Sequence, residues 1–183
     1  MPWPFLYFPD GPLSSAELGA ARLDGDLVEV GEAFMPADAV ETAELRAGSL
    51  GRVVGARWAL THESAGWVHG AFPEPPAVHC VQRCVATRSQ TVLDGRLRYR
   101  DVRIPVGDVQ WVGGVAVSTV VRTFVDLLRD RVLDQGDSDR TVRSMLEWRP
   151  GLAAEGLLWL EQAGPVHHKR AAQEYLRAAV RKT

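Results

Sequence analysis

Residues 114–127 carry the sequence Gly-Val-Ala-Val-Ser-Thr-Val-Val-Arg-Thr-Phe-Val-Asp-Leu. The apolar run at 115–117 predicts a strand, and Ser118 or Thr119 follows it as the cap of a helix. Apolar side chains then recur at helical spacing as far as about Leu133. We therefore expect a buried strand to pass directly into a helix with one buried face.

Further strand candidates precede this segment. Residues 77–81 form a short apolar run, and residues 97–104 alternate in polarity after an Asp94-Gly95 pair that is typical of a hairpin turn. Residues 109–112 and 115–117 predict a second hairpin around two glycines. Together these segments predict a small, mostly antiparallel sheet. Helices at 139–148, 151–162 and 166–181 should follow the helix that starts near residue 118, so the C-terminal half is expected to be helical.

The N-terminal residues predict a different unit. Residues 1–12 form an aromatic lead, and Ser14 with Glu17 forms a capping box for a helix that ends near Arg22. A small hairpin at 27–35 follows, so helix and hairpin have the shape of the end of a winged helix. We expect a helix at 37–54 and another that Thr61 caps. The predicted fold is α+β, with an aromatic lead and winged-helix-like remnant at 1–50 and an α+β domain at 51–183.

Charge is unevenly distributed along the 183 residues, whose net charge is −2. Residues 1–50 carry −7, residues 51–105 carry +4, residues 106–164 carry −3 and residues 165–183 carry +4. Such asymmetry marks either a partner surface or segments that pair within the fold. No apolar run is long enough to span a membrane, the first residues do not resemble a signal peptide, and the two cysteines cannot form a disulfide scaffold. We expect a protein of the reducing cytoplasm.

The chemistry-bearing residues do not converge on a catalytic site. Asp137 and Asp139 flank a serine in a helix breaker, which favours a cap over a metal site. Cys80 and Cys84 have a spacing that zinc tolerates, but His79 alternates to the opposite strand face, so a tetrahedral ligand set is missing. No glycine-rich phosphate loop occurs. We expect no enzyme activity, no cofactor and no bound metal.

Two segments together resemble the bacterial AbiEi family, which comprises antitoxins and transcriptional regulators of type IV toxin–antitoxin systems. One is Leu60-Thr61-His62-Glu63-Ser64-Ala65-Gly66-Trp67-Val68-His69-Gly70, and the other is the segment at 114–127. The matching motif residues are Ser64, Ala65, His69, Gly70, Arg122, Thr123 and Asp126. Gly66 stands where the family commonly has a second alanine. We interpret the motif residues as architectural, with contacts to a partner or to nucleic acid as the alternative.

The resemblance implies an N-terminal winged helix that binds duplex DNA and a following antitoxin domain that opposes a nucleotidyltransferase-like toxin. Here only the last helix and the wing match, and the wing is acidic, which opposes phosphate binding. Nucleic acid would instead meet basic residues of a strand and of the last helix, namely Arg96, Arg98, Arg100, Arg103, Lys169, Arg170, Arg177, Arg181 and Lys182. The predicted function is a non-catalytic antitoxin or regulator that binds DNA, a toxin or both. The alternative is an orphan protein-interaction module that has lost DNA binding.

Overall fold

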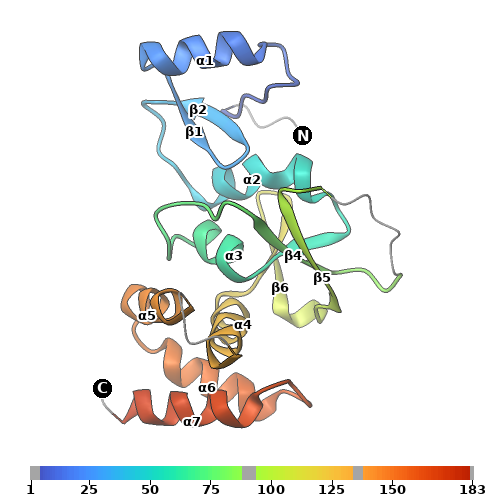
Figure 1. Cartoon of the computed structure of the whole chain (residues 1–183), viewed down its shortest axis with the longest axis vertical. Helices are drawn as coiled ribbons and strands as arrows, with labels where there is room; N and C mark the ends of the chain where they lie inside the picture. The colour runs from blue at the N-terminus through green and yellow to red at the C-terminus, as the bar shows by residue number, and fades with distance from the viewer. Residues whose placement is uncertain (1–4, 88–93, 134–137, 182–183) are drawn as a thin grey trace.

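The computed structural model describes residues 5–87, 94–133 and 138–181, without the side chains of residues 133, 138 and 139. The chain forms three layers along its longest axis: a helix with a hairpin, a sheet flanked by two helices, and a group of four helices (Figure 1). This arrangement confirms the α+β class expected from the sequence.

The N-terminal layer consists of α1 (Ser15–Asp24), β1 (Leu27–Val30) and β2 (Ala33–Pro36). Ser14 and Glu17 form the expected capping box, because the Ser14 hydroxyl accepts a hydrogen bond from the Glu17 amide and the Glu17 carboxylate accepts one from the Ser14 amide. Gly25 ends α1 with a φ of 85°, a left-handed conformation that suits glycine. Leu18 is the buried side chain of α1.

The five-stranded sheet has the order β5-β4-β3-β7-β6. Its strands are β3 (Trp58–Leu60), β4 (His79–Arg83), β5 (Leu97–Arg103), β6 (Val109–Val112) and β7 (Val115–Ser118). The pairs β3–β4 and β6–β7 are antiparallel, whereas β3–β7 and β4–β5 are parallel. The sheet is therefore mixed, and the short 3-10 turn η1 (Val106–Asp108) leads into its edge strand β6.

Two expectations from the sequence are wrong in detail. Asp94-Gly95 does not close a hairpin, because β5 runs parallel to β4. The Asp94 carboxylate instead makes a local contact, in which it accepts a hydrogen bond from the Arg96 amide. The helix expected over 37–54 is α2 (Ala43–Val54), which begins only at the Thr42 cap. Residues 37–42 form turns and irregular backbone, and the Thr42 hydroxyl accepts a hydrogen bond from the Leu45 amide at 3.3 Å, which caps the helix there.

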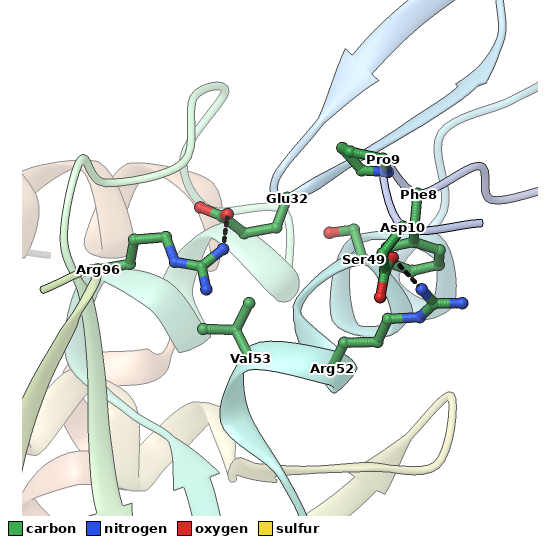
Figure 2. A pocket seen from close by; sticks show the side chains of 8 residues that line it. All are labelled: Phe8, Pro9, Asp10, Glu32, Ser49, Arg52, Val53 and Arg96. Carbon is green, nitrogen blue, oxygen red and sulfur yellow. Dashed lines mark hydrogen bonds and ion pairs between the residues drawn. The ribbon is translucent and has the colours of Figure 1, made fainter. Parts of the chain in front are cut away.

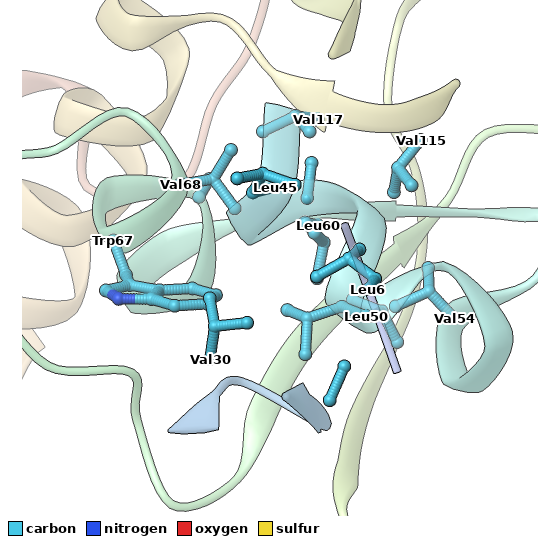
Figure 3. Close-up of a cluster of buried hydrophobic side chains, with 14 of the residues drawn as sticks. Leu6, Val30, Leu45, Leu50, Val54, Leu60, Trp67, Val68, Val115 and Val117 are labelled. Carbon is cyan, nitrogen blue, oxygen red and sulfur yellow. The ribbon is translucent and has the colours of Figure 1, made fainter. Parts of the chain in front are cut away.

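One apolar core joins the N-terminal layer to the sheet (Figure 3). Val30 of the hairpin, Leu50 of α2 and Leu60 of β3 lie in it together with Trp67 of α3 (His62–Val68). Leu6 of the aromatic lead also contributes. The expected domain boundary after residue 50 falls inside α2, whose side chains pack on both layers.

A second apolar core holds the four C-terminal helices. They are α4 (Val120–Leu133), α5 (Ser138–Trp148), α6 (Leu152–Gln162) and α7 (Lys169–Val180). Phe124, Leu127 and Leu128 of α4 are buried in this core, as their helical spacing predicted. Within the described residues, no helix is both long and apolar enough to cross a bilayer.

The glycine that departs from the family pattern has a packing reason. A Cβ atom at Gly66 would lie 2.3 Å from the Phe72 ring, which is closer than real Cβ atoms approach. Phe72 packs against both apolar cores. The ring therefore fills the space that an alanine side chain would need.

Replacing Gly66 with alanine should lower the free energy of unfolding by about 1–3 kcal/mol, the usual cost of overpacking a core. Gly19→Ala is the matched control, because nothing lies within 4 Å of a Cβ at Gly19 in α1, and alanine there should stabilise by up to about 1 kcal/mol. Chemical denaturation measures both, and Gly66→Ala combined with Phe72→Leu should recover part of the loss. A Gly66→Ala protein as stable as the native chain would contradict this packing account.

Candidate partner and nucleic-acid surfaces

The two motif segments, about fifty residues apart in the chain, meet in the structure. The His69 Nε2–H donates to the Ser118 carbonyl oxygen at 2.7 Å, which joins the end of α3 to the start of the α4 segment. The Ser64 hydroxyl accepts a hydrogen bond from the Cys80 amide at 2.9 Å, and Ala65 is fully buried beside it. Gly70 follows α3 with a φ of 89°, so glycine suits this helix stop. These residues hold α3 between the sheet and α4.

Arg122 lies at the centre of a buried ion-pair network. Its Nε donates to Asp126 at 2.7 Å and its Nη1 donates to Asp108 at 2.8 Å. Asp126 also accepts from Arg129 at 2.9 Å, and Asp108 accepts from the Trp159 indole at 2.9 Å. The network therefore ties α4 to η1 and to α6. Asp126 in α4 and Asp108 in η1 are both buried, so the geometry of their pairs with Arg122 is fixed by packing.

The other motif hydroxyl is also buried. Thr123 Oγ1 lies 2.7 Å from the Ser118 hydroxyl and 3.3 Å from the Ser118 carbonyl oxygen, to which it can donate. This pair caps the junction between β7 and α4. The side chains of Ser64, His69, Arg122, Thr123 and Asp126 thus each form a hydrogen bond within the fold, and Ala65 is buried.

A second polar cluster surrounds His62, the first residue of α3. His62 has a φ of 53°, a left-handed conformation that is uncommon for a side chain of this size. Its Nδ1 lies 2.9 Å from the Thr61 hydroxyl and its Nε2 lies 3.6 Å from Asp130 of α4. Burial, together with the nearby Arg100 guanidinium, lowers the pKa of His62 to about 3. The imidazole is therefore neutral and serves packing at the α3–α4 junction.

The cysteine beside this cluster is not an activated nucleophile. Burial, reinforced by the Glu63 carboxylate 3.8 Å from its sulfur, raises the pKa of the Cys80 thiol to about 11. A thiol held in its protonated form reacts slowly. Among the described residues, no three His, Cys, Asp or Glu side chains group as a metal site; Asp137 lies outside the described residues.

Two of the four strand arginines are engaged in ion pairs. Arg96 binds Asp94 at 2.7 Å and Glu32 at 2.8 Å, and these carboxylates raise its pKa. Arg100 binds Asp130 of α4 with both of its terminal nitrogens. Arg98 and Arg103 are exposed on β5. Two of the four guanidinium groups are therefore held by carboxylates, although the side chain of Arg96 stays half exposed.

The last helix presents an exposed basic stripe. Arg170, Arg177 and Arg181 are all exposed, and their spacing by seven and four places them along one side of α7. Glu174 interrupts this stripe, and Arg177 lies 3.9 Å from Glu161 of α6. Lys169 is half-buried, since its ammonium donates to the Ala163 carbonyl oxygen at 2.6 Å, and Lys182 lies outside the described residues.

A cavity of about 360 Å³ lies where the N-terminal layer meets the sheet (Figure 2). Arg52 of α2 pairs with Asp10 and lies over the Phe8 ring, while Arg96 pairs with Glu32 of the hairpin. The charged groups around it thus neutralise each other. A second cavity of about 390 Å³ borders Arg103, Arg122 and Trp159, where the buried Arg122 network forms one wall.

Comparisons with known proteins add little to this geometry. No family model matches the chain, and no curated protein matches it. A crystal structure of the RV2827C protein from Mycobacterium tuberculosis matches with a TM-score of 0.36 and 16% sequence identity, over 93% of this chain and 76% of that one. A match this weak carries no argument about fold or function.

Sequence reasoning missed the partners of the motif arginine and of the strand arginines. Asp108, Trp159, Asp130 and Glu32 lie far from their partners in the chain, and no spacing rule brings them together. The one signal in the sequence for any of these contacts is the i, i+4 spacing of Arg122 and Asp126, which form an ion pair in the structure.

Asp126→Ala should destabilise the fold strongly, because it leaves Arg122 and Arg129 without a buried carboxylate. Removing one member of a buried ion pair costs about 3–5 kcal/mol. Glu161→Ala is the matched control at an exposed pair and should change the free energy of unfolding by less than about 0.5 kcal/mol. Denaturant titrations of the two variants measure the difference, and equal stabilities would contradict the structural assignment of Asp126.

The stability of the fold should fall as the pH drops below 6.5, the ordinary pKa of histidine. The unfolded chain binds a proton at His62 there, whereas the folded chain does not until about pH 3, so acid favours unfolding. His62→Asn removes this titration and suits the left-handed backbone. Its free energy of unfolding should vary with pH less steeply than that of the native chain, by about 1 kcal/mol per pH unit. Denaturation at several pH values measures both proteins. If their free energies of unfolding depend on pH with the same slope, His62 does not have the lowered pKa.

Proposed function

We propose that the chain is a non-catalytic, cytoplasmic antitoxin or transcriptional regulator of the AbiEi type, which acts by binding. The proposal rests on the resemblance of the two motif segments, and their contact with each other supports it. Segments that match a family in order and spacing also pack as one unit here, through His69, Ser118 and the Arg122 network.

The polar side chains of the fold favour binding over catalysis. Asp108, Asp126 and Asp130 are each held in ion pairs, and the Cys80 thiol is kept protonated by burial. Groups that are fully engaged in structural pairs are poorly placed to move protons or to attack a substrate. The side chains of Arg170 and Arg181, in contrast, are exposed on α7, where a partner can reach them.

The exposed arginine stripe of α7 carries the proposed DNA contact. The family's usual DNA element is the winged helix, but residues 14–36 hold five acids and one base. Those carboxylates would repel phosphates, whereas Arg170, Arg177 and Arg181 would neutralise them and release counterions. The interaction should be weak and sensitive to salt, because Glu174 lies in the same stripe.

A nucleotidyltransferase-like toxin is the proposed protein partner. The alternative, an orphan interaction module without DNA binding, differs from this in its genetic context. A toxin gene of that type next to the gene for this chain favours the antitoxin, and its absence favours the orphan module.

The test is a salt titration of binding to duplex DNA for the native chain and for Arg170→Ala/Arg181→Ala. Affinity should fall with a slope of about 0.9 per phosphate contact between roughly 0.05 and 0.2 M salt, so the double variant should lose up to about 1.8 of that slope. Arg22→Ala/Arg57→Ala is the matched control, since both side chains are exposed and the change in charge is the same.

The control should keep the native slope. Tight, sequence-specific binding of the native chain at physiological salt, unaffected by the α7 substitutions, would show that the winged-helix-like layer binds DNA. The same titration with Arg98→Ala/Arg103→Ala measures the contribution of β5.

A further inference from the structure

Helix α1 has an apolar face that no other part of the described chain covers. Leu23 is 83% exposed, and Ala16 and Ala20 are exposed on the same side of the helix, at positions i, i+4 and i+7. Leu18 alone anchors the opposite side. A ten-residue helix is marginally stable in water, so contacts along a free apolar face would stabilise it.

Carboxylates surround this face. Glu17 and Asp24 lie on α1 itself, and Asp26 and Glu29 follow in the hairpin. The turn that contains Asp26 lies against the end of α1, since the Asp26 amide donates to the Ala21 carbonyl oxygen at 2.9 Å. Arg22, the one base here, lies 3.5 Å from Glu29. An occupant of this face must therefore be positively charged, which excludes nucleic acid.

The complementary surface is present on the same molecule, at its other end. Val180 of α7 is 40% exposed beside the arginine stripe. Arg170 and Arg177 are seven residues apart, and so are Glu17 and Asp24, which places each pair of charges about 10.5 Å apart along its helix. The two faces thus match in charge and in spacing.

Figure 1 shows α1 and α7 at opposite ends of the longest axis, with the sheet between them. The two helices of one molecule therefore cannot meet. We propose that the α1 face binds the α7 stripe of a second copy of this chain. A contact between two different faces is heterologous, so it leaves one free face at each end and extends into open chains of molecules unless the rotation between neighbours closes a ring.

The association should be weak. Two short helices bury less surface than the roughly 800 Å² per partner of a stable interface. Its charged rim makes it dependent on ionic strength, because the Debye length falls from about 30 Å at 0.01 M salt to about 3 Å at 1 M. The stripe also carries the proposed DNA contact, so DNA should compete with self-association.

Sedimentation velocity of the full chain without DNA tests the proposal. At about 0.01 M salt the average mass should rise continuously with protein concentration, and at about 1 M salt it should return to that of one chain. Leu23→Ser should weaken the association at least several-fold. Val106→Ser, at another exposed valine, is the matched control and should leave it unchanged.

Charge exchange tests the pairing itself. Asp24→Lys/Asp26→Lys and Arg170→Glu/Arg177→Glu should each abolish self-association of the single protein. In an equimolar mixture of the two, without native chain, the native α7 stripe of the first protein can bind the native α1 face of the second, and their reversed faces can also pair, so association should return with the two proteins alternating. Circular dichroism melting checks that each variant is folded. A chain that stays monomeric at low salt and high concentration would overturn the proposal, as would a closed dimer that the charge-reversed variants still form. Because no DNA is present, either result leaves the proposed DNA contact to its own titration.

Discussion

The pairing of Arg122 with Asp126 and Asp108 is the constraint on which the C-terminal half depends. One guanidinium joins the start of α4, the turn before β6 and, through the Trp159 indole, helix α6. A buried charge is tolerated only when its partners are in place. The sheet and the helical layer must therefore assemble in one relative position, and the motif that carries the family resemblance is also what fixes that position.

Local patterns predicted several of the elements. The capping box at Ser14, the glycine pair between β6 and β7 and the helical spacing of Phe124 and Leu127 each act over a few residues. Strand direction is a different matter, because Asp94-Gly95 has hairpin composition and yet β5 pairs parallel to β4. All five residues of β4 are buried, and the strand pairs with β3 on one side and β5 on the other, so its pairing depends on segments that are separated from it in the chain.

Charge was the least predictable property of the candidate surfaces. Arg96, Arg98 and Arg100 stand at every second position of the sequence, so the pattern does not distinguish them. In the structure, Glu32 pairs with Arg96 and Asp130 pairs with Arg100, and both acids come from other elements. The number of arginines can be counted in the sequence, but which of them form ion pairs depends on the tertiary fold. Helix α7 keeps an exposed stripe: within the part of the chain that the structure describes, the acid of a neighbouring helix that approaches it is Glu161, 3.9 Å from Arg177. What is left is a molecule with a negative end and a positive end.

The anchoring of α1 by Leu18 has a consequence for how the chain opens. Local unfolding takes least free energy where few apolar side chains must be exposed. Separating α1 from the hairpin exposes one buried leucine, whereas α2 cannot leave without opening the core around Leu50 and Trp67. The native chain therefore contains cooperative units of different stability, and α1 can unfold and refold while the rest stays folded. A partner that covers the outer face of α1 would oppose this local unfolding.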